Sequence, residues 1–175
     1  MKIYLTRHGE VPSNIKKIYN LKEEDLTEKG LEQADILRKK VEKLDYDAIY
    51  TSPYLRAVHT AELANAKDKK IIIDERLRER EAGDLIGKPL DSTDRREYWK
   101  YDPSIEYPTS EDIKTFFERI RTFIESLKDT SYDAVLVVAH SGVSKAFSAY
   151  FDGIGDGEFL DRGIDNCEIK EYELN

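Results

Sequence analysis

Two of the three histidines in this 175-residue chain stand just beyond apolar segments and are followed by glycine at once or after one residue. His8 comes shortly after residues 2–5, and His140 directly follows the apolar run at 134–139. An imidazole can attack a phosphorus atom when its ring is oriented and the charge on the phosphoryl group is neutralised. Two histidines in equivalent positions therefore point to phosphoryl-transfer chemistry. His59, inside a helical pattern, is expected to be structural.

Cations that could hold a phosphoryl group accompany these histidines. Arg7 precedes the first of them, and Arg56 lies about one turn into a predicted helix. A planar guanidinium donates two parallel hydrogen bonds to phosphate oxygens, so both arginines are candidate phosphate ligands. Gly9 and Gly142 are expected to let the backbone approach the ligand closely. A helix starting near Ser141 would offer free N–H groups to an anion.

The rest of the sequence supplies the elements that must position these residues. Strands are predicted over 2–5, 47–51, 71–73, 134–139 and 166–173, with 71–73 buried. Helices are predicted after an N-cap at Thr27, after Ser52 with Pro53 in the first helical position, after Thr109 or Ser110, and over 143–151. Residues 74–110 are expected to be rich in loops, with one short helix near 92–100.

Strands that alternate with helices predict an α/β fold. We expect a three-layer sandwich in which a mostly parallel central sheet carries helices on both faces. In such sheets ligands bind beyond the carboxyl ends of the strands. His8, Arg56, Glu79 and His140 each follow a predicted strand, so they are expected to open onto one edge. Judged by its local sequence alone, Glu79 is one carboxylate of a charged run and favours solvent.

The charge balance excludes several classes of partner. The chain carries 28 basic and 36 acidic side chains, a net charge of −8. An acidic chain lacks the basic surface of a nucleic-acid binder or of a protein that binds anionic membranes. An anionic substrate must then be held by a local cluster of cations that works against the global field.

The same composition predicts one cytoplasmic domain over residues 1–175. The only cysteine, Cys167, supports neither a disulfide framework nor a multi-cysteine metal site. No apolar stretch reaches the length of a membrane-spanning helix, and residues 1–10 do not have the pattern of a signal peptide. The sequence leaves the oligomeric state open, a homodimer included.

Five blocks of the chain resemble, in order, the motifs of the histidine phosphatase superfamily, and in particular of its phosphoglycerate mutase-like members. The blocks are 6–10 (TRHGE) with Asn14, 26–34 (LTEKGLEQA), 51–57 (TSPYLRA) with Thr60 and Ala61, 77–79 (LRE) with 83–84 and 87–88, and 137–143 (VVAHSGV). The short motif RHG is weak evidence by itself. Five blocks in the family's order are highly specific.

The resemblance implies a catalytic role for five residues. It implies that His8 becomes phosphorylated transiently, and that Arg7, Arg56 and a protonated His140 hold the phosphate. Glu79 would protonate the leaving oxygen and then activate water. The place of Glu79 in a matching block outweighs its charged local surroundings, which alone favour a solvated carboxylate.

The resemblance also implies a substrate-binding set and no cofactor. This set is expected to comprise Arg7, Asn14, Arg56, Ser141 and Gly142. Cationic side chains would take the place of a metal ion at the phosphate, so neither a metal nor another cofactor is expected. The chain departs from the family's pattern at Asn20, Leu21, His59 and 109–112. These departures concern substrate contacts, and none of them removes a catalytic group.

The implied activity is that of a histidine acid-type phosphatase, a phosphomonoesterase for small phosphorylated metabolites. A cofactor-dependent phosphoglycerate mutase is the first alternative, because Arg95 and Arg96 could clamp a substrate. A solvated helix face is the favoured interpretation of that pair, and Pro108 lies only 20 positions after Lys88, short for a mutase. The sequence is also compatible with a phosphohistidine protein phosphatase and with a catalytically silent phosphoprotein-binding domain.

Overall fold

The computed structural model describes residues 1–175, built around one five-stranded sheet with the strand order β3-β2-β4-β1-β5. The strands are β1 (Lys2–Arg7), β2 (Ala48–Thr51), β3 (Lys70–Ile73), β4 (Ala134–Ala139) and β5 (Ile169–Glu173). The first four are parallel, and β5 runs antiparallel to β1. The mostly parallel sheet predicted from the sequence is therefore confirmed.

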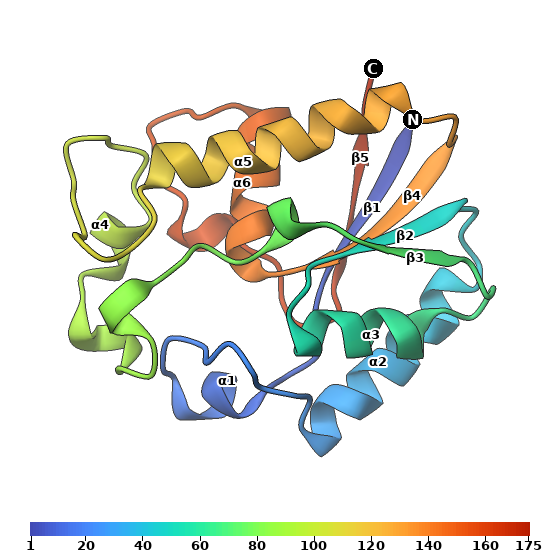
Figure 1. Cartoon of the computed structure of the whole chain (residues 1–175), viewed down its shortest axis with the longest axis horizontal. Coiled ribbons are helices and arrows are strands. Elements are labelled where there is room, and N and C mark those ends of the chain that lie inside the picture. Colours follow the sequence, from blue (N-terminus) through green and yellow to red (C-terminus); the bar gives the residue numbers. More distant parts are fainter.

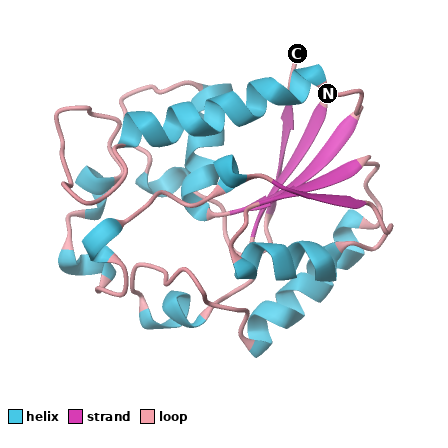
Figure 2. Cartoon of the chain, in the orientation of Figure 1, coloured by secondary structure: helices cyan, strands magenta, loops and turns pink.

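Helices cover both faces of this sheet (Figures 1 and 2). They are α1 (Pro12–Lys16), α2 (Glu28–Val41), α3 (Leu55–Ala64), α4 (Arg95–Tyr98), α5 (Ile113–Ser126) and α6 (Ser141–Asp152). Helices α2 and α3 pack together on one face, and α5 and α6 pack on the other. This arrangement is the expected three-layer α/β sandwich. None of these helices combines the length and the apolar composition of a membrane-spanning segment.

Strand β4 is fully buried because its two sets of side chains enter two different cores. Val135 and Val137 belong to a cluster of 25 buried residues that includes the apolar faces of α5 and α6. Leu136 and Val138 belong to a cluster of 12 buried residues on the side of α2 and α3. Successive side chains of a strand point to opposite faces, so a central strand between two helical layers is apolar throughout.

Three local expectations were wrong. The helix predicted to start at Ser52 and Pro53 begins at Leu55, because the Ser52 hydroxyl is engaged with His140 at 2.7 Å. The predicted caps Thr109 and Ser110 lie too early, since Asp112 accepts from the Thr115 N–H at 2.9 Å and caps α5.

The third concerns the segment 71–73, expected to be a buried strand. It forms β3, which pairs only with β2 at the edge of the sheet, and Ile73 is 57% exposed. The apolar run did not distinguish an edge strand from a central one. Helix α1, only five residues long, was not predicted at all.

The loops that follow β1, β2 and β4 gather at one end of the sheet. Parallel strands place their carboxyl ends on the same side, so the residues after β1, β2 and β4 meet there. The excursion between β3 and α5, which contains α4, lies at this end and away from both chain termini (Figure 1). The residues that follow these strands therefore lie at one edge of the sheet, as the sequence predicted.

Candidate active site

His8 lines a cavity of about 460 Å³ at this end of the sheet. Its side chain is buried, and its Nδ1 lies 2.7 Å from the carbonyl oxygen of Gly9. A carbonyl oxygen only accepts, so Nδ1 carries the proton and the lone pair is on Nε2. Burial and the charges of Arg56 and Arg7 hold the pKa of His8 well below its ordinary value. The imidazole is therefore neutral and able to act as a nucleophile.

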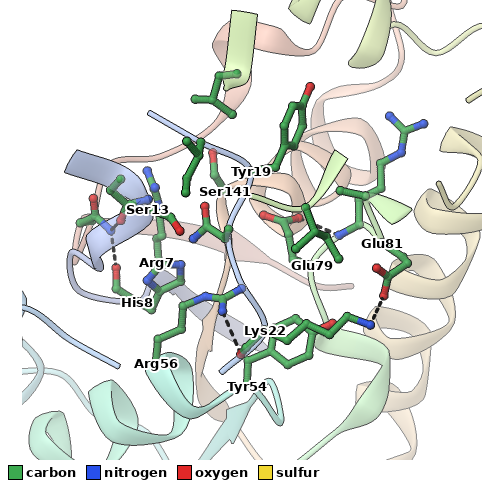
Figure 3. Close-up of a pocket in the computed structure, with 18 of the residues that line it drawn as sticks. Arg7, His8, Ser13, Tyr19, Lys22, Tyr54, Arg56, Glu79, Glu81 and Ser141 are labelled. Carbon is green, nitrogen blue, oxygen red and sulfur yellow. Dashed lines mark hydrogen bonds and ion pairs between the residues drawn. The ribbon is translucent and has the colours of Figure 1, made fainter. Parts of the chain in front are cut away.

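The two predicted phosphate ligands, Arg7 and Arg56, line the same cavity (Figure 3). Arg56 donates from Nη1 to the carbonyl of Leu21 at 2.9 Å, and Arg7 donates from Nη1 to the carbonyl of Ile164 at 3.4 Å. The buried Nε atoms of both arginines have no hydrogen-bond partner. Unpaired buried donors beside a neutral imidazole suit an anionic ligand such as a phosphoryl group.

A buried carboxylate that the sequence did not single out supports Arg56. Glu24 accepts from the N–H and the hydroxyl of Ser13 at 2.8 and 2.5 Å, and from the N–H of Leu21 at 3.2 Å. These bonds fix the loop whose Leu21 carbonyl holds the guanidinium of Arg56. Glu24 therefore positions Arg56, the predicted phosphate ligand, through the backbone.

His140 lies next to His8, and it is not among the residues that line the cavity. The two rings are 5.2 Å apart between centroids, and Nε2 of His140 is 2.7 Å from the hydroxyl of Ser52. Its buried Nδ1 has no partner. Burial and the charge of Arg56 lower the pKa of His140 well below its ordinary value, so the protonated form expected for this residue is disfavoured without a bound anion.

Glu79 lines the cavity across from the arginines (Figure 3). It comes after a turn of 3-10 helix, Glu75–Leu77, and not directly after β3. Its two carboxylate oxygens accept at 2.9 Å each, Oε1 from the N–H of Arg80 and Oε2 from the N–H of Gly142. Two backbone donors hold the carboxyl group in one orientation, as a proton donor to a leaving group requires.

The predicted roles of the two glycines need correction. A Cβ on Gly142 would lie 2.0 Å from Oε1 of Glu79, and a Cβ on Gly9 would lie 2.6 Å from the carbonyl oxygen of Gly30. Gly142, which does not line the cavity, makes room for Glu79 and not for a ligand. Gly9 makes room for the first turn of α2.

Arg119, on α5, holds the loop that carries Glu79. Its guanidinium donates to the carbonyl of Arg78 at 3.0 Å and to both carboxylate oxygens of Glu111 at 2.9 and 2.6 Å. The sequence did not point to this residue, because nothing in the spacing of α5 relates it to residues 76–79.

The remaining predicted ligands, Asn14 and Ser141, also line the cavity. Oδ1 of Asn14 accepts from the N–H of Val11 at 3.1 Å, which closes the turn after β1. Two further lining residues were not predicted. Asn166 donates to the carbonyl of His8 at 2.8 Å, and Lys145 is almost fully buried on α6. His59 lies outside the cavity and contacts Asp25 at 2.7 Å.

A neutral histidine, two arginines with free donors and a fixed carboxyl group form a site for phosphoryl transfer to and from nitrogen. Comparison with known proteins gives the family. The model of the histidine phosphatase superfamily (branch 1) matches residues 3–175, so the chain belongs to that superfamily.

Named relatives of the chain have different activities. It is 33% identical to "Putative phosphoserine phosphatase 2" of Hydrogenobacter thermophilus, over 99% of this chain and 89% of the relative. It is 30% identical to a 2,3-bisphosphoglycerate-dependent phosphoglycerate mutase of Bartonella bacilliformis, over 99% and 92%. The alpha-ribazole phosphatase structure from Shigella flexneri superposes with a TM-score of 0.85 at 26% identity, over 100% and 91%. Phosphomonoester hydrolysis is consistent with this family and this site.

Proposed function

We propose that the chain is a histidine acid-type phosphatase that hydrolyses small phosphate monoesters through a phosphohistidine on His8. The observation that carries the proposal is the free Nε2 of His8 in the cavity that Arg7 and Arg56 also line. Neutralising the charge on the phosphoryl oxygens is the main task of such a site, and the two guanidiniums supply it without a metal ion.

In the first step, Nε2 of His8 attacks phosphorus and the bond from phosphorus to the ester oxygen breaks. Glu79 gives its proton to that oxygen, and the alcohol leaves. Arg7 and Arg56 balance the charge on the transferred group. The unpaired Nδ1 of His140 becomes a donor to a phosphoryl oxygen if the Ser52 hydroxyl donates to Nε2.

In the second step, water attacks the phosphorus of the phosphohistidine. Glu79, now a carboxylate, takes a proton from that water, and the bond from phosphorus to Nε2 breaks. Inorganic phosphate leaves and Nε2 regains its lone pair. The same carboxyl group serves both steps because Arg80 and Gly142 fix its position.

Solvent access favours hydrolysis over return of the phosphoryl group to a second substrate. Lys22 and Glu81 form an ion pair of 2.8 Å across two loops that line the cavity (Figure 3). Their side chains are 53% and 38% exposed, so water reaches the rim of the cavity. A mutase must keep water away from its phosphoenzyme. Because one relative of the chain is named a phosphoglycerate mutase, mutase activity is the alternative to test.

A panel of phosphate esters assayed for released phosphate tests the proposal. We expect turnover of alkyl and aryl phosphates, and a phosphohistidine that is labile to acid and stable to base. With 3-phosphoglycerate and 2,3-bisphosphoglycerate, we expect phosphate release and little isomerisation. Label on serine or aspartate, or isomerisation faster than hydrolysis, would contradict it. Absence of turnover and of labelled His8 would favour a binding domain.

A further inference from the structure

The cavity carries more positive charge than a phosphoryl group needs. Its cationic lining residues are Arg7, Lys22, Arg56, Arg80, Arg95 and Lys145, and its carboxylates are Glu10, Glu79 and Glu81. Lys22 is paired with Glu81, and Arg80 donates to the carbonyl oxygens of Tyr98 and Glu111. Arg7 and Arg56 serve the phosphate. Arg95 and Lys145 are left without a carboxylate partner.

Lys145 is a buried cation that forms no ion pair with a carboxylate, although the charge of Glu79 acts on it. Its side chain is 2% exposed, its ammonium donates to the carbonyl of Leu160, and it lies 5.3 Å from the centre of the Trp99 ring. Burial lowers the pKa of Lys145 to about 8. Burying an unpaired ammonium is costly, so a structural role alone does not account for it. A bound anion would offset that cost.

Ser141 lies beside this ammonium. A Cβ on Gly163 would be 2.5 Å from Oγ of Ser141 and 2.8 Å from Nζ of Lys145, so the two atoms are neighbours. Both residues line the cavity, one turn apart on α6. Ser141 precedes Gly142, whose N–H holds Glu79. An anion here would therefore be next to the carboxyl group that protonates the leaving oxygen.

Arg95 completes the positive edge of the cavity, whereas its neighbour does not. Arg95 lines the cavity and its buried Nε has no partner. Arg96 is 66% exposed and lies 3.5 Å from Asp161 outside the cavity. The two arginines therefore do not act as a pair, and Arg96 provides a matched control.

We propose that Lys145, Ser141 and Arg95 form a subsite for a carboxylate on the alcohol part of the substrate. This rests on the proposed function, because it places the phosphoryl group on His8 and the leaving oxygen at Glu79. Ammonium, hydroxyl and guanidinium donors match the two oxygens of one carboxylate. The preferred substrates are then phosphate esters of small hydroxy acids, and O-phosphoserine is one of them.

Two pairs of esters that differ in the carboxylate test the proposal. The pairs are O-phospho-L-serine with O-phosphoethanolamine, and 3-phosphoglycerate with glycerol 3-phosphate. We expect the wild type to prefer the carboxylated member in both pairs. Lys145→Met should remove about 10- to 100-fold of that preference, mainly through KM, as expected for a lost hydrogen bond to a charged group. Arg95→Met should act in the same direction, and Arg96→Met should not.

The two esters of a pair are compared within each variant. Glu79 lies near Lys145, so a substitution there can lower the activity on both esters, and this shared loss cancels in their ratio. Equal activity of the wild type on both members would overturn the proposal, as would a preference that persists in Lys145→Met. If that variant does not fold, Ser141→Ala and the inhibition constants of 2-carboxyethylphosphonate and propylphosphonate on the wild type decide the question. If p-nitrophenyl phosphate labels His8 but the enzyme shows no preference for the carboxylated ester in either pair, the subsite alone is refuted. No label from any ester would refute the phosphatase.

Discussion

The N–H of Gly142 donates to Glu79 at 2.9 Å, and any side chain on that glycine would collide with the same carboxylate. The first turn of α6 therefore fits against Glu79, and also against the ring of Trp99, because residue 142 has no Cβ. Through this contact, the motif that follows β4 orients Glu79, the proposed proton donor, which lies in a different block of the sequence.

Gly142→Ala should displace Glu79 and leave the nucleophile in place. A Cβ placed 2.0 Å from Oε1 forces the carboxyl group to move, so general-acid assistance is lost. We expect kcat for glycerol phosphate to fall by about 10²-fold or more. Phosphorylation of His8 by p-nitrophenyl phosphate should be much less affected, and rapid-quench labelling measures it. Similar losses on both esters would mean that the variant damages the phosphate site instead.

Glu79→Gln should separate the two steps of the reaction. A nitrophenolate leaves without protonation, whereas an alkoxide does not, so hydrolysis of alkyl phosphates should fall by about 10²- to 10⁴-fold. Attack of water on the phosphohistidine should slow as well. With p-nitrophenyl phosphate, stopped-flow absorbance should show a burst of nitrophenol followed by a slow steady state. A loss of equal size on both esters without a burst would assign Glu79 a structural role, and Glu10 and Glu81 would be the remaining carboxylates that line the cavity.

Arg7→Ala and Arg56→Ala should each lower kcat/KM by about 10²- to 10³-fold, as for the loss of one donor to a developing oxyanion. Arg96→Ala, which removes an exposed arginine outside the cavity, is the matched control and should retain activity. The wild type should keep its activity in EDTA, because the phosphoryl charge is met by guanidiniums. Loss of activity in EDTA with recovery on a divalent cation would refute the assignment.

Buried His8 and His140 should make the protein less stable as the pH falls. Burial lowers the pKa of both imidazoles in the folded state, so below the ordinary histidine pKa the unfolded chain binds more protons. The free energy of unfolding then falls with decreasing pH, by at most about 1.4 kcal/mol per pH unit for each histidine. Urea unfolding at pH 7 and pH 5 measures this slope.

The contribution of the two histidines is isolated by comparison with His8→Asn and His140→Asn, in which the slope should be smaller. Inorganic phosphate should reduce the loss in the wild type, because a bound anion favours the protonated rings. A slope that is unchanged in both variants would assign the pH dependence to carboxylates.

The sequence predicted those parts of the site that depend on strand ends. His8 and His140 follow β1 and β4 because apolar strands are recognisable and parallel strands end on one side. The short motifs also placed Arg7 and Arg56 correctly in the cavity. Side-chain contacts between distant segments were not predictable in this way.

Lys145 and Glu24 illustrate what was missed. Lys145 lies within an apolar helix as the only charged residue before its last position, which is a signal that a pattern search could use. Glu24 lies in an acidic stretch whose other members are exposed, and only the fold shows that Ser13 turns toward it. The wrong N-cap at Ser52 has the same origin, since its hydroxyl is committed to a histidine 88 positions away.

The alternation of β4 between two cores has a consequence for how the molecule unfolds. Neither apolar layer can lose its packing without exposing one set of β4 side chains, so the two layers should melt as one cooperative unit. Trp99, the only tryptophan, belongs to the cluster on the side of α5 and α6, and its fluorescence reports on that layer. Far-ultraviolet circular dichroism reports on the helices of both layers. The two signals should therefore give a single, coincident transition.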